Sequence, residues 1–342
     1  MLYTNQTAEE LDSLYRCTTD GIFNAQNSIF MKINFVFSFF IFLTFFVSFW
    51  AFRVLKFHNI YSSGTQFLLV VVLLNSNFNQ LVFLEIRIRH LIQIWTYYSD
   101  PCKIEFHNSE CYYDNNFYMF TNYLATWLVC ALTFDRFLAF YAKNLYENSK
   151  IISVILVVVA IILTLIVHLI IYSNVPLAGY VPSCQYPPQL SLNSFQLATN
   201  IKILCSILMC LVIMFHLYFI IRQDKRIRHT VYDTSTRYSS FENVLTTKSV
   251  LTIAVTQLFF SCLSSIAVTI VRHFEKGMTE YTYHILTQYV AGLLYGNLSI
   301  PILIYLKTTQ CIRYRRQKIT KMTLEPDLME SRMISLKAMW EK

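Results

Sequence analysis

Charged residues are scarce in this chain of 342 residues: they make up 14% of it, against about 25% in ordinary soluble proteins. Hydrophobic residues make up 55% and gather in runs near the length that crosses a hydrocarbon core of about 30 Å as a helix. This composition excludes the two soluble domains that length alone would allow. It predicts an all-α protein that crosses a membrane several times.

Glycine and proline are also scarce within these runs, and the side-chain groups that catalysis needs are missing. Gly292, Gly296 and Pro301 are the only glycines or prolines inside any run, away from its ends. A transporter usually shows repeated halves and helices broken near mid-membrane, and no repeat is visible here. The runs hold no paired carboxylates, no nucleophile with its base and no histidines at metal spacing. We therefore expect no enzyme, no cofactor and no metal.

Seven apolar runs are present, and they predict a seven-transmembrane helix bundle. They divide the chain into an N-terminal segment 1–29, a helix domain 30–306 and a tail 307–342. The first segment is acidic and lacks a cleavage-site pattern, so it does not read as a signal peptide. Amide side chains in the second run are predicted to bond to neighbouring helices. The predicted spans are 30–52, 65–84, 112–134, 151–172, 196–221, 249–271 and 282–306.

The distribution of lysine and arginine predicts the orientation of the bundle. One side carries 20 of the 28 basic residues, in segments 53–63, 136–150, 222–248 and the tail. Without the tail the same side still leads by 11 to 8. The N-terminus is thus expected outside and the C-terminus in the cytoplasm. Asn5 begins an Asn-Gln-Thr sequon on the outer side and is a predicted glycosylation acceptor.

Four of the nine cysteines lie in the predicted outer segments, where disulfides can form. They are Cys17, Cys102, Cys111 and Cys184. Four cysteines permit three connectivities. A pair of Cys17 with Cys102 would hold the N-terminal segment over the mouth of the bundle, and a pair of Cys102 with Cys111 competes with it.

The stretch "LTFDRFLAF" places an acid and a base, Asp135 and Arg136, in an otherwise apolar run. Either charge costs roughly 2.5–3.5 kcal/mol at the middle of a membrane helix, so the pair is expected near the water boundary or at a site with a function. Arg136 follows Cys111 by 25 positions, about 37 Å of helix. One helix therefore has Cys111 at its outer mouth and Arg136 at its inner end.

An outer cysteine on the third helix, "DRF" at the inner end and one cysteine in the next outer loop resemble a rhodopsin-like G-protein-coupled receptor. The stretches "FHNSECYYDNNFY", "FENVLTTKSVLTIAVTQLFF" and "GNLSIPILIYLK" are similar to the nematode serpentine chemoreceptors of class alpha. The similarity covers nearly the whole chain. It implies a disulfide between Cys111 and Cys184 that ties the third helix to the following loop.

The resemblance also implies a role for the charged pair. In such receptors the arginine is held inward at rest by its neighbouring acid and by the sixth helix, and on activation it contacts the G-protein. Here Asp135 would restrain Arg136 in a surface-proximal ion pair worth about 0–1 kcal/mol. Glu242 would be the second restraint, with a solvated loop carboxylate as the equal alternative. A cation snorkelling to lipid headgroups is the alternative for Arg136.

The chain departs from the receptor pattern in its seventh run. Asn297, Pro301 and Tyr305 are spaced four and four, whereas rhodopsin-like receptors place Asn next to Pro with Tyr three residues beyond. Pro301 still predicts a bend, because proline removes a backbone donor and clashes with the preceding turn, so these three residues are the expected hinge. Cys311, in a basic stretch after the run, is a palmitoylation candidate.

These observations together predict a chemosensory receptor that couples an external chemical to a heterotrimeric G-protein. The ligand is an unknown small molecule or peptide, and its binding residues are unknown. The apolar middle of the third run disfavours a charged amine. Membrane lipid is a partner, nucleic acid is not expected, and dimerisation is left open. A plasma-membrane location follows, and sensory-neuron cilia are implied by the resemblance alone. The alternatives are a seven-helix ligand-gated channel of inverted topology, or a transporter.

Overall fold

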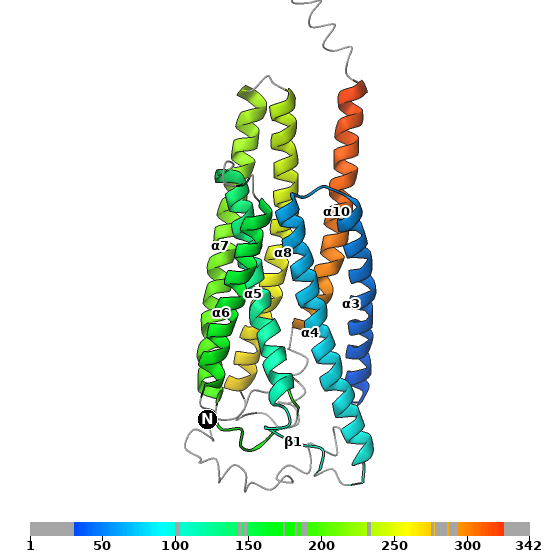
Figure 1. Ribbon diagram of the computed structural model, residues 1–342, viewed down its shortest axis with the longest axis vertical. Helices are drawn as coiled ribbons and strands as arrows, with labels where there is room; N and C mark the ends of the chain where they lie inside the picture. The colour runs from blue at the N-terminus through cyan, green and yellow to red at the C-terminus, as the bar shows by residue number, and fades with distance from the viewer. Residues whose placement is uncertain are drawn as a thin grey trace, which may run out of the picture.

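Seven long helices dominate the described part of the chain and run side by side in one bundle (Figure 1). They are α3 (Met31–Phe57), α4 (Ser63–Thr96), α5 (Tyr112–Tyr141), α6 (Ser149–Tyr172), α7 (Leu192–Thr230), α8 (Thr234–His273) and α10 (Leu293–Leu324). The computed structural model describes residues 31–99, 103–142, 146, 149–173, 175–181, 183–185, 191–230, 234–274, 277, 286 and 293–324. The predicted all-α seven-helix bundle is confirmed.

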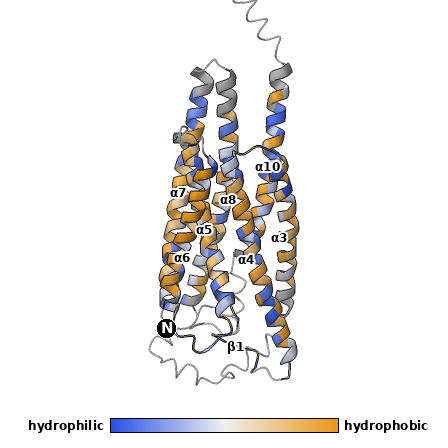
Figure 2. Cartoon of the chain, in the orientation of Figure 1, coloured by the Kyte–Doolittle hydropathy of each residue, from blue (hydrophilic) through white to orange (hydrophobic). Residues whose placement is uncertain are grey.

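The outside of the bundle is apolar, as a lipid-facing surface must be. Six helices in the described residues, α3 to α8, are long and apolar enough to cross a membrane. Phe39, Phe46 and Phe215 expose 63–66% of their surface, and such patches are rare on soluble monomers. Hydrophobic residues cover the shaft of the bundle, and hydrophilic residues colour the upper parts of α7 and α10 (Figure 2). The chain is a multi-pass membrane protein.

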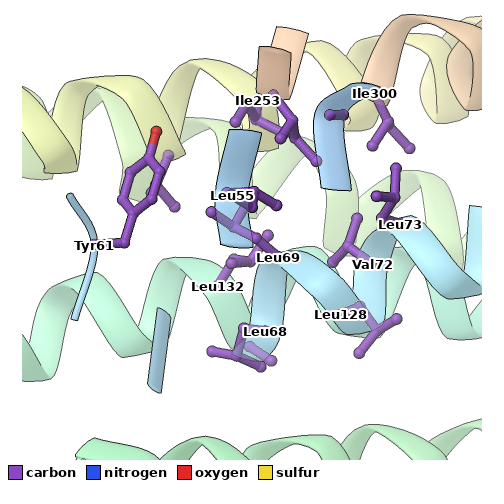
Figure 3. Packing of buried hydrophobic residues seen from close by; sticks show 14 of the residues in the cluster. Leu55, Tyr61, Leu68, Leu69, Val72, Leu73, Leu128, Leu132, Ile253 and Ile300 are labelled. Carbon is purple, nitrogen blue, oxygen red and sulfur yellow. The ribbon is translucent and has the colours of Figure 1, made fainter. Parts of the chain in front are cut away.

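The half of the bundle away from the disulfide, which the sequence predicts to be the inner half, is held by a cluster of buried hydrophobic side chains from six helices. Figure 3 shows Leu55 of α3 and Leu132 of α5 close to the leucines and Val72 of α4, with Ile253 of α8 and Ile300 of α10 above them. Without a water-driven force between helices, close packing of this kind is the main attraction within a membrane. It fixes α4 at the centre of the inner half.

A glycine lets α4 and α6 meet at the inner end. A Cβ on Gly64 would lie 2.3 Å from the carbonyl oxygen of Ser149, so a larger residue would push the helices apart. Ser62 accepts a hydrogen bond from the backbone N–H of Thr65 at 3.4 Å, which caps the start of α4 as serine commonly does. The starts of α4 and α6 are thereby brought against the end of α5.

The opposite end, which the sequence predicts to be the outer one, is closed by a two-stranded sheet and a disulfide. Strand β1 (Phe106–His107) pairs antiparallel with β2 (Tyr180–Val181). Gly179 precedes β2 with φ of 85°, a left-handed conformation that glycine adopts without strain. The disulfide joins Cys111, at the start of α5, to Cys184. The loop after α6 is thus fastened over the mouth of the bundle, and the implied Cys111–Cys184 pairing is confirmed.

Candidate functional site

Asp135 and Arg136 lie near the inner end of α5 and are buried, with 0% and 2% of their surfaces exposed. The Arg136 Nε and Nη2 atoms both donate to Asp135 Oδ2, at 3.0 and 2.7 Å. The expectation of a surface-proximal pair was therefore wrong. Helix α5 ends only at Tyr141, so the pair sits more than a turn inside the helix, where α4 and α6 cover it.

Hydroxyl groups from neighbouring segments complete the hydrogen bonds of this buried pair. Thr65 of α4 donates to Asp135 Oδ2 at 2.7 Å, and Ser153 of α6 donates to Oδ1 at 3.4 Å. Arg136 Nη2 in turn donates to Thr65 Oγ1 and, at 3.4 Å, to Ser62 Oγ. Burying two charges is tolerated where the geometry is good and the remaining polar atoms are satisfied, and both conditions are met here.

Tyr146, from the segment between α5 and α6, closes the cluster from the inner side. Its hydroxyl donates to Asp135 Oδ1 at 3.1 Å and accepts from Arg136 Nη2. Burial is the main cause that raises the pKa of this phenol; Arg136 lowers the pKa and Asp135 raises it. The group therefore stays protonated at neutral pH. We call Asp135, Arg136, Tyr146, Thr65 and Ser62 the inner polar cluster.

Glu242 does not belong to the inner polar cluster. Its carboxylate lies 3.3 Å from Arg315 Nη1, and both side chains are about one-third exposed. It therefore joins α8 to α10, and its predicted contact with Arg136 is wrong. The acceptors of Arg136 in the described residues come from α5, the start of α4 and Tyr146. The contacts of Glu242 and Arg136 depend on the register of α8 against α5. The local sequence does not specify that register.

Asn297 and Pro301 of α10 are buried against α4. Asn297 Nδ2 donates to Asn79 Oδ1 at 2.7 Å, and Asn79 donates to the Thr121 hydroxyl of α5 at 2.5 Å. Pro301 has no N–H to give to the carbonyl of Asn297, four residues earlier, and Ser76 of α4 donates to that carbonyl at 3.0 Å instead. The predicted bonding of amides between helices is confirmed at Asn79, and the gap left by the proline is filled from α4.

Two other predicted residues occupy unexpected positions. Tyr305 is 37% exposed, so its ring lies on the outer surface of α10 and not with Asn297. Cys311 is fully buried, with its sulfur 2.9 Å from Ser249 Oγ of α8. This position withholds the thiol from acylation, so the palmitoylation expectation does not fit the structure. Asn5, Cys17 and Cys102 lie outside the described residues.

The sequence did not indicate Tyr146, Thr65, Ser62 or Ser76 as parts of a site. Each is a common hydroxyl residue with no motif around it, and its importance comes from what lies opposite in space. Lys202 was counted with the outer basic residues, but it lies inside α7 and is 8% exposed. A lysine within the apolar stretch "NIKILCSILM" was the one signal that could have drawn attention to it.

Comparison with known proteins gives the family of this seven-helix bundle. The family described as serpentine type 7TM GPCR chemoreceptor Sra matches residues 13–340. The chain belongs to this family. Among its relatives in Caenorhabditis elegans, serpentine receptor class alpha-27 is 55% identical over 99% of both chains. Serpentine receptor class alpha-20 is 34% identical over 98% of this chain and all of its own length.

A third relative, serpentine receptor class alpha-25 of the same organism, is 36% identical over 95% of this chain and 98% of its own. The resemblance read from the sequence is thereby confirmed. As a serpentine chemoreceptor, this chain is a multi-pass plasma-membrane receptor of a family named for chemosensory reception, and the named relatives are receptors, not enzymes. The inner polar cluster is accordingly the candidate site for signalling.

Proposed function

We propose that this serpentine chemoreceptor converts binding of an external chemical into activation of a heterotrimeric G-protein. The observation that carries the proposal is the inner polar cluster, in which a buried arginine donates to four residues at the end of the bundle opposite the disulfide. Disulfides form in oxidising compartments, so the disulfide end is the outer one and Arg136 faces the cytoplasm. By family resemblance, the cilia of sensory neurons are the proposed location.

The same end offers a surface suited to a large partner. Helices α7, α8 and α10 extend beyond the others at the inner end of the bundle (Figure 1). Arg222 and Lys225 on α7 and Arg313 and Arg316 on α10 are exposed there. Basic groups next to a span also attract anionic lipid, at about 1 kcal/mol each, so the charge supports membrane contact and partner docking alike.

In this proposal Arg136 has two states, one restrained by the cluster and one released from it. In the described state Arg136 is held by Asp135, Tyr146 and Thr65 and is withheld from any partner. A ligand that favours a state with α4, α5 and α6 rearranged would break these bonds by its differential affinity for the two states. The freed guanidinium, with five donors in a rigid fork, would then bind backbone carbonyls of the G-protein.

The experiment that tests the proposal is Arg136→Ala, assayed for G-protein activation alongside surface expression. We expect activation to be lost, by ligand and in the absence of ligand, while surface expression persists. The unpaired Asp135 carboxylate will lower stability, but expression should persist because the carboxylate keeps the donors Thr65, Tyr146 and Ser153. The matched control is Arg53→Ala on α3, a cation with an exposed side chain that packs on the Trp50 ring. Normal activation by the Arg136 variant would overturn the proposal.

A further inference from the structure

A second buried cation lies toward the outer end of the bundle. Lys202 is the eleventh residue of α7, about 15 Å along the helix from Leu192. Only 8% of its surface is exposed. Its Nζ donates to Asn122 Oδ1 of α5 at 2.6 Å and lies 5.6 Å from the centroid of the Tyr123 ring. Ionisable residues are costly within a membrane, and those that are kept usually mark a binding site or pathway.

The charge of Lys202 has no counter-charge in the part of the chain that the structure describes. Its two partners there, an amide oxygen and an aromatic ring, are neutral. Arg136 is also a buried cation, but it has the Asp135 carboxylate at 2.7 Å. Removing an ammonium from water is repaid only by an opposite charge with good geometry. Among the described residues, Lys202 is therefore a buried positive charge without an acid beside it.

Two hydroxyl groups on turns next to the lysine contact lack acceptors in the described part of the chain. Ser206 lies one turn further along α7 and Thr126 one turn beyond Asn122 on α5, so each shares a helix face with a member of the lysine contact. Both hydroxyls are buried and have no hydrogen-bond partner among the described residues. Thr199, on the same face of α7, instead donates to the carbonyl four residues before it, at 2.8 Å.

Helix α8 adds a third such group. Ser261 is buried, and its hydroxyl also has no partner among the residues described. It adjoins Cys262, which is close enough to Lys202 for an electrostatic interaction. One turn before it, Gln257 donates to the Ala125 carbonyl of α5 at 3.2 Å, which holds this face of α8 against α5. Each of three helices thus carries one such hydroxyl within a turn of Lys202 or of a residue that interacts with it.

We propose that Lys202 is the anchor for an acidic ligand, and that the ligand's carboxylate is the missing counter-charge. The ammonium would form the ion pair, and the Ser206, Thr126 and Ser261 hydroxyls would donate to the carboxylate oxygens. A single cation with neutral donors matches one negative charge, which favours a monocarboxylic acid over a phosphate. This assignment rests on the proposed function for its signalling meaning, whereas binding itself does not require a G-protein.

The test is the thermal midpoint of the purified receptor with acetate, butyrate, hexanoate and benzoate, each compared with its neutral amide. A ligand that binds only the folded state raises the midpoint. We expect at least one carboxylate to raise it by several degrees, its amide to have no effect, and Lys202→Met to abolish the rise. Lys225→Met, an exposed lysine on the same helix, is the matched control and should keep the rise.

A second measurement needs no ligand. Lys202→Met should raise the midpoint of the unliganded receptor, because it removes an uncompensated buried charge; a lower midpoint would show a structural lysine and overturn the proposal. It is also overturned if no carboxylate shifts the midpoint, if the amides shift it equally, or if the Lys202 variant still responds. A Lys202-dependent rise in a receptor that activates no G-protein would contradict the proposed function and leave the ligand site intact.

Discussion

At the scale of single residues, what matters most is that the Asp135–Arg136 pair is buried. An exposed pair is worth at most about 1 kcal/mol, and thermal motion would break it often. The buried pair is different, since hydrogen bonds to charged groups contribute about 1.5–3 kcal/mol each. The restraint on Arg136 is therefore spread over several hydroxyl groups, and each of them tunes how strongly the resting state is favoured.

Tyr146→Phe tests this distribution. The variant loses one donor to Asp135 and one acceptor for Arg136, which should weaken the resting state by about 1.5 kcal/mol. We expect basal G-protein activity to rise roughly tenfold if all of that difference is lost on activation. Tyr141→Phe is the control, because Tyr141 is 52% exposed on α5. Unchanged basal activity in the Tyr146 variant would show that the tyrosine is no part of the restraint.

At the scale of helices, α4 is the element that organises both functional regions. Its first turn supplies Thr65 to the Asp135–Arg136 pair, and its middle supplies Ser76 and Asn79 to α10. A movement of α10 relative to α4 would thus be transmitted to Arg136, because α4 is continuous between the two contacts. Pro301 weakens the backbone of α10 where Ser76 binds it, which makes this contact the proposed hinge between the two helices.

The Ser76–Pro301 contact can be measured by a double-mutant cycle. Ser76→Ala leaves the Asn297 carbonyl buried without its donor, which costs about 1–3 kcal/mol, so the thermal midpoint should fall. In the Pro301→Ala background the backbone N–H of residue 301 is restored, and Ser76→Ala should cost much less. Ser299→Ala is the control, because Ser299 donates within its own helix to Gly296, at 2.8 Å. If Ser76→Ala lowers the thermal midpoint equally in both backgrounds, the Ser76 hydrogen bond does not compensate for the missing N–H of Pro301.

At the scale of the whole molecule, the two ends of the bundle have different chemistry. One end has the Cys111–Cys184 disulfide and the small sheet, and the other has the projecting basic ends of α7 and α10. Helix α3 begins at the disulfide end and α10 ends at the basic end (Figure 1). The lysine and arginine distribution and the oxidising environment of disulfides both predict that the basic end is cytoplasmic.

Antibody access to tags at the two termini of the chain tests this orientation. In intact cells we expect the N-terminal tag to be stained and the C-terminal tag to be stained only after permeabilisation. An untagged receptor serves as the background control in both conditions. The reverse pattern would put Arg136 on the outer face, away from any G-protein, and would favour the ligand-gated channel of inverted topology.

The sequence predicted the helices better than it predicted their ends. The second apolar run ends at residue 84, whereas α4 continues to Thr96, and α5 passes the end of the third run at 134 to reach Tyr141. Hydropathy identifies the part of a helix that lies in hydrocarbon. It does not identify polar turns by which the helix continues into water. Burial of Arg136 was missed for a related reason, since the charge of a residue does not show what packs around it.

The sequence by itself determined the class of this protein: seven apolar runs force seven helices, because the backbone in lipid must satisfy its own hydrogen bonds. It also determined the family, through motifs spread over nearly the whole chain. Only the tertiary structure decided that Tyr146 and Thr65 hold the Asp135–Arg136 pair, that Glu242 binds Arg315, and that Lys202 is buried with no acid beside it among the described residues. These contacts join residues that are distant in the chain, and they depend on helix rotation and register, which no local pattern specifies.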